Sequence, residues 1–283
     1  MDEGPHMTYA TLMVHLCPGQ TNTAVLASAR HLADRFSAAV IGIAATQPMQ
    51  MDMGDGTTAV GVYALNRDEI DGEVRALEVE FRKALGAAVP DLRWRSASLL
   101  SSLPAYLARE ARSADLLLTA IDASSYFDNM RRVDTGDLIL QAGRPVLLVP
   151  AATQPCRLER VMVAWKDTRE TRRAVVDALP LLRTATHVSL VEIRDGKDGR
   201  AESEARLADV VAWLKRHGVA VVECVSSPSS DDDATALFAL GQDRGIDLTV
   251  AGAYGHSRMR EWVLGGVTRD LLVRADRCSL VSH

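Results

Sequence analysis

A glycine-rich stretch near the C-terminal end of the sequence is the strongest candidate for chemistry. Its glycines, Gly252, Gly255, Gly265 and Gly266, give the pattern G-x-x-G-x9-G. Glycine readily adopts positive φ angles and lets a ligand approach the backbone closely. Successive amides of such a turn can hold an anion, and a helix beginning at "VTRDLL" would add its positive N-terminus. The spacing therefore predicts a phosphate-binding loop.

The elements that must position this loop come from an internal repeat. Each half of the chain opens with an apolar run, "YATLMVHL" in the first and "RLERVMVAW" in the second. Further apolar runs then alternate with helical patterns, in which residues such as Val25, Ala29 and Leu32 share one face. Each half therefore predicts the order β-α-β-α-β-α-β-α-β.

Strands that alternate with helices predict α/β domains with parallel sheets covered on both faces. Right-handed crossovers favour a doubly wound, five-stranded, Rossmann-like sheet in each half. We place the two tandem domains at 8–150 and 157–283, on either side of the turn-rich linker "PAATQPCR". Ligands bind such sheets at the carboxyl edge where the strand order reverses, and the glycine stretch follows the fourth strand of the second half.

Composition argues against several functional classes. The 283 residues carry a net charge of −5, so nothing favours nucleic acid or an anionic membrane as a partner. No apolar run reaches the length of about eighteen residues that spans a membrane, and the first residues do not resemble a secretory signal. The four cysteines, Cys17, Cys156, Cys224 and Cys278, form no C-x-x-C pair. We expect a cytoplasmic protein with reduced thiols and no metal site.

His256 and Ser257 stand side by side on the glycine stretch, which raises the possibility of catalysis. A nucleophile needs a base within hydrogen-bond reach, and adjacent loop residues rarely point at each other. The motif G-x-S-x-G is also missing. A phosphate contact is the favoured interpretation of His256, with surface exposure as the alternative, and we expect no enzyme. ATP hydrolysis stays open as a weaker hypothesis.

With these motifs, the chain from Thr8 to His283 resembles a tandem universal stress protein. "GAYGHSRMREWVLGGVT" is similar to the family's nucleotide signature, G-x-x-G-x9-G-[ST] followed by V-T. "VAWKDTRETRRAVVDALPLL" and "AGRPVLLVP" resemble a bacterial tandem subgroup. The resemblance implies paired α/β domains, a cytoplasmic location, pairing through the last strands within one chain or in a homodimer, and ATP binding in many members.

The resemblance also implies a set of binding residues. The end of the second half's first strand and Ile193 would contact adenine, and the glycine loop with the start of the last helix would hold ribose and phosphates. The implied set comprises Ala164, Trp165, Lys166, Ile193, Gly252, Gly255, His256, Ser257, Gly265, Gly266, Val267 and Thr268. No residue is assigned a catalytic or metal-binding role.

Two departures from the family pattern bear on this site. Gly266 stands where a Ser or Thr hydroxyl would bind the terminal phosphate, and Lys166 stands where nucleotide-binding members usually carry Asp. Trp165 and Lys166 have ordinary alternatives, core packing for the indole and solvation for the ammonium group. The first half has no G-x-x-G after its fourth strand and carries Leu16, Cys17 and Pro18 after its first. We therefore predict no nucleotide there.

The sequence thus predicts a regulatory universal stress protein. Its second half would bind ATP or another adenine nucleotide, with or without Mg²⁺, and the occupied form would be recognised by protein partners that the sequence does not identify. The alternative is a stress-response scaffold that acts through protein partners without a nucleotide.

Overall fold

The structure is a computed structural model, and it describes residues 8–47, 59–121, 133–150, 157–194, 199–228, 233–253 and 277–283. The elements of the first half are β1 (Thr11–His15), α1 (Thr23–Phe36), β2 (Ala39–Thr46), α2 (Ala59–Leu85), β3 (Leu92–Ser98), α3 (Leu103–Glu110), the 3-10 turn η1 (Ala111–Ser113), β4 (Leu116–Ile121), α4 (Thr135–Ala142) and β5 (Val146–Pro150). Those of the second half are β6 (Arg160–Trp165), α5 (Arg169–Thr184), β7 (His187–Arg194), α6 (Arg200–Arg216), β8 (Val221–Pro228), α7 (Asp233–Asp243), β9 (Leu248–Gly252) and β10 (Cys278–Ser282).

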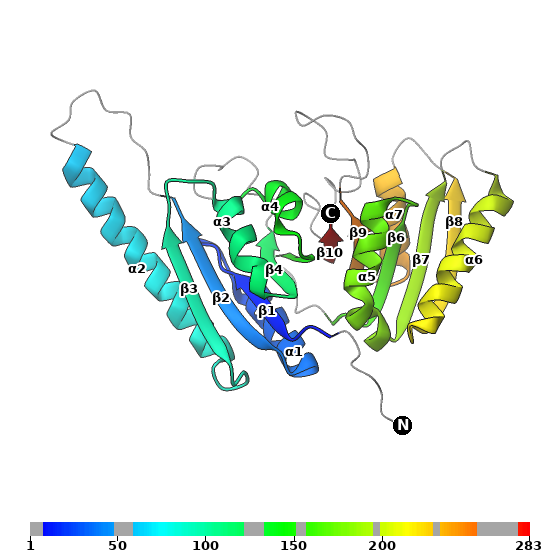
Figure 1. Cartoon of the computed structure of the whole chain (residues 1–283), viewed down its shortest axis with the longest axis horizontal. Coiled ribbons are helices and arrows are strands. Elements are labelled where there is room, and N and C mark those ends of the chain that lie inside the picture. Colours follow the sequence, from blue (N-terminus) through cyan, green and yellow to red (C-terminus); the bar gives the residue numbers. More distant parts are fainter. Residues whose placement is uncertain are drawn as a thin grey trace.

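The strands form one ten-stranded sheet in the order β3-β2-β1-β4-β5-β10-β9-β6-β7-β8 (Figure 1). Within each half all pairs are parallel, and only β5 and β10 pair antiparallel. The predicted doubly wound, five-stranded sheet is confirmed in both halves. The last strands join the two sheets within one chain, so the intrachain form of the predicted pairing is the one observed.

The two halves are related by a pseudo-twofold axis between β5 and β10. Following paired residues from strand to strand gives one row across the sheet, in which Leu147 faces Leu280 at the centre. The row runs Trp94, Gly42, Val14, Leu118, Leu147, Leu280, Val250, Val163, Leu190, Cys224. Counting outwards from the centre therefore makes Trp94 equivalent to Cys224 and Gly42 equivalent to Leu190.

The same equivalence holds at the amino ends of the first strands. Asp115 Oδ2 accepts hydrogen bonds from the amides of Ala10 and Thr11, both at 2.9 Å. Asp247 accepts from the amides that correspond to these, those of Glu159 at 3.0 Å and Arg160 at 3.2 Å. An aspartate before the fourth strand thus fixes the start of the first strand in both halves.

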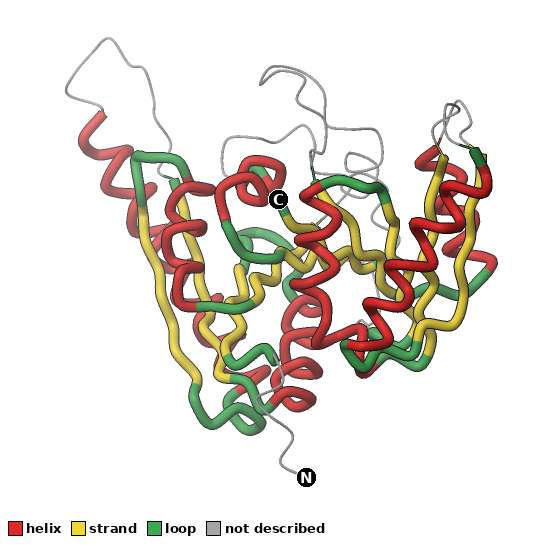
Figure 2. The backbone as a smooth tube through the Cα atoms, turned by 45° about the vertical axis from the view of Figure 1, so that its right-hand side comes forward, coloured by secondary structure: helices red, strands yellow, loops and turns green. Residues whose placement is uncertain are grey.

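Helices lie on both sides of the strands (Figure 2). One core cluster contains buried side chains from α1, α2, α5 and α6 and extends through both halves. On the other face, α3 and α4 cover the first half and α7 packs on the second. Tyr9 also links the halves, because its hydroxyl donates to the carbonyl of Asp177 at 2.6 Å.

The structure confirms one local prediction and differs from two others. Gly218 has a φ of 76° just after α6, as expected for a residue that ends a helix. Helix α2 starts at Ala59, inside a segment that the sequence favoured as loop. The prediction of four reduced cysteines is wrong at Cys278, which takes part in a disulfide, whereas Cys17 and Cys224 do not.

None of the helices in the described ranges is both long enough and apolar enough to cross a membrane.

Candidate functional site

The strand order reverses between β6 and β9 in the second half, and two alanines stand side by side at this point. Ala164 on β6 is in register with Ala251 on β9, and both side chains are buried. Each contributes only a methyl group at the carboxyl edge of the sheet, next to the start of the glycine stretch. Ala164 therefore lies at the switch point of the sheet, the region where doubly wound sheets bind ligands.

The first half fills the equivalent position with polar side chains. His15 and Thr119 correspond to Ala164 and Ala251, and His15 Nδ1 lies 2.9 Å from Thr119 Oγ1. The Sγ atom of Cys17 lies 3.7 Å from the same nitrogen. Burial lowers the pKa of His15 to about 4, so the ring is neutral at physiological pH. Sequence reasoning missed His15, whose only signal was a histidine ending an apolar run.

Gly252 is explained by helix packing. A Cβ atom at this position would lie 2.4 Å from the backbone nitrogen of Thr171 and 2.6 Å from the carbonyl carbon of Glu170. Only three residues separate β6 from α5, against seven between β1 and α1, and the first turn of α5 lies against the end of β9. The missing side chain of Gly252 thus makes room for α5. The next amide, that of Ala253, donates to the carbonyl of Ser282 at 2.8 Å.

The N-terminus of α5 also lies at this edge, and the protein itself satisfies it. Thr168 is the N-cap residue, and its Oγ1 accepts from the amide of Thr171 at 3.3 Å. The buried carboxylate of Glu170 pairs with Arg169. Burial raises the pKa of Glu170, but hydrogen bonds from Arg169, from its own amide and from Thr168 bring that pKa below its usual range. A negative charge thus occupies the place where a helix N-terminus would otherwise attract phosphate.

The other predicted residues at the strand ends lie in different surroundings. Trp165 is 8 % exposed and packs in the core with Val161 and Val163. Its Nε1 has no hydrogen-bond partner among the described residues. Lys166 is exposed in the short loop, where its carbonyl accepts from the amide of Thr168 at 2.7 Å.

The side chains of the remaining predicted residues lie outside the part of the chain that the structure describes. Ile193 lies on β7, and its side chain is outside the described residues. The rest of the predicted phosphate loop also lies outside the described residues, namely Gly255, His256, Ser257, Gly265, Gly266, Val267 and Thr268. Their roles stay predictions. Within the described ranges no group of three or more His, Cys, Asp or Glu side chains could hold a metal ion.

No protein-family model matches the sequence of this chain, and no curated protein sequence does so either. Solved structures do match over nearly the whole length. A universal stress protein from Archaeoglobus fulgidus DSM 4304 superposes with a TM-score of 0.74 at 10% identity, covering 96% of this chain and 95% of that one.

Two proteins from Pseudomonas aeruginosa are also similar in structure. A protein of unknown function from strain PAO1 has a TM-score of 0.63 at 15% identity and covers 97% and 92% of the two chains. A putative universal stress protein from strain UCBPP-PA14 has a TM-score of 0.61 at 16% identity and covers 97% and 93%. Over both of its halves, this chain therefore has the fold of the universal stress proteins.

Proposed function

We propose that the protein is a regulatory universal stress protein that binds ATP or another adenine nucleotide in its second half only. The observation that carries this proposal is the difference between the two switch points. Ala164 and Ala251 are small and pack with apolar residues of the second half, whereas His15 and Thr119 occupy the first switch point with a hydrogen-bonded pair. A planar base binds against apolar surroundings, which supports the second half as its binding place.

The described residues limit where the phosphates of such a nucleotide would lie. The Glu170 carboxylate and the N-cap hydroxyl of Thr168 occupy the N-terminus of α5, so phosphate is disfavoured there. The phosphates would instead follow the loop from Gly255 to Thr268, whose sequence predicts backbone donors. Lys166, exposed at the end of β6, is the nearest candidate cation of the short loop. Because Gly266 supplies no hydroxyl, we expect weaker recognition of the terminal phosphate than in members with Ser or Thr.

Calorimetric titration with ATP, ADP and AMP tests this proposal. We expect about one site per chain. Grafting the first half's pair onto the second, with Ala164→His and Ala251→Thr together, should abolish binding because the crevice is filled. The matched control is the reverse change, His15→Ala with Thr119→Ala, which should leave affinity unchanged. Thermal unfolding of each variant separates loss of binding from loss of fold. Absence of heat with all three nucleotides would contradict the proposal.

A scaffold that needs no nucleotide is the second candidate. It is favoured by the packing role of Gly252 and by the Glu170 carboxylate at the crevice. The variant for this test is Gly255→Val, because a change at Gly252 would also disturb α5. If Gly255→Val abolishes nucleotide binding and stress survival is unchanged, the scaffold is favoured.

We assign no catalytic residue and do not propose an enzyme. Sustained phosphate release from ATP by the purified protein, lost in His256→Ala, would overturn this assignment. We further propose that the protein is cytoplasmic and acts through protein partners rather than on nucleic acid or membranes.

A further inference from the structure

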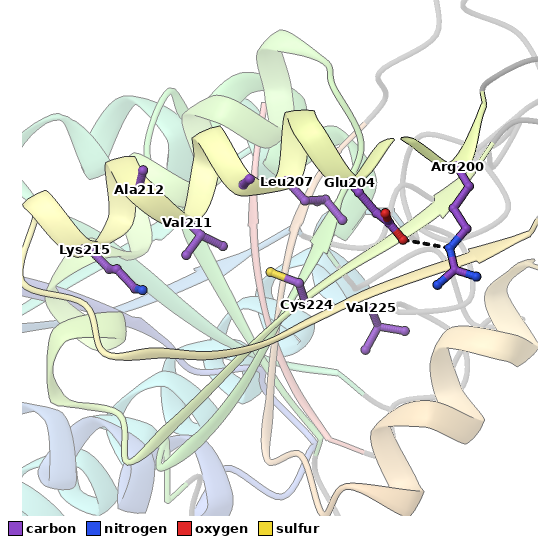
Figure 3. A pocket seen from close by; sticks show the side chains of 9 residues that line it. Arg200, Glu204, Leu207, Val211, Ala212, Lys215, Cys224 and Val225 are labelled. Atoms are coloured by element: carbon purple, nitrogen blue, oxygen red, sulfur yellow. Dashed lines mark hydrogen bonds and ion pairs between the residues drawn. The ribbon is translucent and has the colours of Figure 1, made fainter. Parts of the chain in front are cut away.

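A groove runs between helix α6 and the last strand of the sheet, β8, far from the crevice between β6 and β9. It has a volume of about 620 Å³. Figure 3 shows Leu207 and Val211 reaching from the helix towards the strand, with the thiol of Cys224 below them. Ala208 and Ala212 on α6 and Val225 on β8 add to its mostly apolar lining.

The groove includes the outer edge of β8. Successive residues of a strand point to opposite faces of the sheet, yet both Cys224 and Val225 line this groove. Since β8 is the last strand of the sheet, a groove in contact with both residues lies at the edge of the sheet. Among the described residues, β8 pairs only with β7, so no strand covers this edge. The pairing is regular from Glu223 to Pro228, so this part of the strand can accept a further strand.

At the opposite edge of the sheet, side chains packed around β3 fill the corresponding space. Trp94 on β3 takes the position equivalent to Cys224, and its ring packs against Phe81 of α2 with centroids 5.4 Å apart. Gly42 allows this packing, because a Cβ there would lie 2.6 Å from the Trp94 ring. In the second half Leu190 occupies that place and Cys224 is small, so the groove stays open.

The two edges also differ in charge. On β3, Arg93 and Arg95 flank Trp94 and pair with Asp91 at 3.0 Å and Glu110 at 2.9 Å. Charged side chains on an edge strand prevent the addition of another strand. The sequence of β8, VVECVSSP, has Glu223 as its single charged residue. The first edge thus carries charged side chains and is filled by Trp94, whereas the second has a single charged residue and lies beside an open, mostly apolar groove.

We propose that this groove binds an extended peptide segment of a partner protein, which adds to the edge of β8. Main-chain hydrogen bonds to the strand hold the segment, and an apolar side chain enters the space between Val211 and Cys224, as in other recognition by strand addition. This proposal goes beyond the nucleotide function and does not depend on it.

Charge gives the expected chemistry of the segment. Arg200 at one end of the groove pairs with Glu204 at 2.7 Å and is already neutralised. Lys215 lines the other end, and no carboxylate pairs with it in the described part of the chain. The segment therefore carries an acidic residue at the end that lies next to Lys215, together with its apolar residues.

The test uses the full-length protein without nucleotide and a displayed library of random linear peptides as probe. Enriched peptides are synthesised, and their affinity is measured by fluorescence anisotropy. We expect apolar sequences with an acidic residue. Cys224→Trp, which introduces the residue of the first half, should weaken binding at least about tenfold, as expected for a filled central pocket. Lys215→Glu should weaken acidic peptides and favour their lysine-substituted forms. Val79→Trp, an equally bulky change on the exposed face of α2, is the control and should have no effect.

Amide hydrogen exchange identifies the binding mode. Bound peptide should slow exchange at alternate amides between Cys224 and Ser227, those that point away from β7, and leave β3 unchanged. The proposal is overturned if no peptide is enriched, if enriched peptides bind Cys224→Trp and Lys215→Glu as well as wild type, or if the β8 amides gain no protection. A concentration-dependent dimer that Cys224→Trp makes monomeric would also overturn it, because a second copy of the chain would then be the occupant.

Discussion

The two halves of this protein share a strand order and differ where that order reverses and where the sheet ends. The row from Trp94 to Cys224 crosses the whole sheet with equivalent apolar residues at its centre. At the first switch point a histidine and a threonine fill the space, and at the second only alanines do. The two edges differ in the same direction, with an aromatic pair closing the first and a groove lying beside the second. One topology thus combines a half closed by side chains with a half left open.

The difference teaches that the two halves share the packing at the centre of the sheet and diverge at their switch points and edges. Leu118, Leu147, Leu280 and Val250 are completely buried on either side of the pseudo-twofold axis, where any change affects both halves. His15, Cys224 and their neighbours lie at strand ends or on the outer strands. Substitutions there change positions at which the two halves already differ.

The largest expected effect is at the closed edge. Phe81 is completely buried against Trp94 and Gly42. Phe81→Ala should lower the free energy of unfolding by about 3–5 kcal/mol, because the cavity cannot collapse onto a glycine. Urea unfolding followed by circular dichroism measures it. Val79→Ala, on the exposed face of the same helix, should change stability by less than about 0.5 kcal/mol. A loss at Phe81 as small as this would show that the first edge is not closed by packing.

The filled switch point should make stability depend on pH. Burial lowers the pKa of His15 from 6.5 to about 4, so the unfolded chain binds a proton in this range that the folded chain does not. The stability contributed by neutral His15 is therefore complete above pH 6.5 and is lost as the pH falls towards 4, by up to about 3 kcal/mol. His15→Asn should remove this part of the pH dependence. Unfolding of both proteins at pH 7 and pH 4.5 gives the difference, in which other titrations cancel. Parallel curves would contradict a buried, neutral His15.

A third difference between the two halves is a glycine in the second. Gly252 corresponds to Ala120, and its missing Cβ faces backbone atoms of α5 that no side-chain rotation can move. Gly252→Ala should cost about 1–3 kcal/mol, as overpacking against a fixed neighbour does. The reciprocal change, Ala120→Gly, should cost about 1 kcal/mol through backbone entropy alone. Thermal unfolding measures both. Unchanged stability of Gly252→Ala would mean that α5 can move away, and the glycine would again need a ligand to explain it.

Most of the fold could be predicted from the sequence because periodicity depends on residues near one another in the chain. Alternating apolar runs predicted every strand of the sheet and its doubly wound order, and Gly218 predicted the end of α6. The pairing of β5 with β10 required a choice between one chain and two that no local pattern makes. The start of α2 at Ala59 was also missed, because helical residues there follow a glycine-rich segment that reads as loop.

The site was less predictable because its features depend on residues distant in sequence. Gly252 was assigned to a ligand, and its close neighbours, Glu170 and Thr171, lie about eighty positions earlier in the chain. Trp165 and Ala164 were expected on the same site, but successive strand residues point to opposite faces, and the indole lies in the core. His15 escaped notice because its partner, Thr119, lies on another strand.

The smallest expected difference concerns the two aspartates that fix the first strands. Both amides donate to the single atom Oδ2 of Asp115, whereas Asp247 uses both of its oxygens. The one amide oxygen of asparagine can therefore replace Asp115, and Asp115→Asn should cost a few tenths of a kcal/mol. Asp247→Asn turns an amino group towards a backbone N–H and should cost about 1 kcal/mol.

The raised pKa of Asp247 has the opposite effect on the cost of Asp247→Asn. Burial raises that pKa, so the charged form is less favourable in the folded state, and asparagine would relieve part of the cost at pH 7. We expect the lost hydrogen bond to outweigh this relief, because the carboxylate is only partly buried and water lessens the charge penalty. Urea unfolding at pH 7 compares the two variants. If Asp247→Asn is the more stable one, the buried charge outweighs the hydrogen bond, and the two aspartates differ in energy despite their equivalent positions.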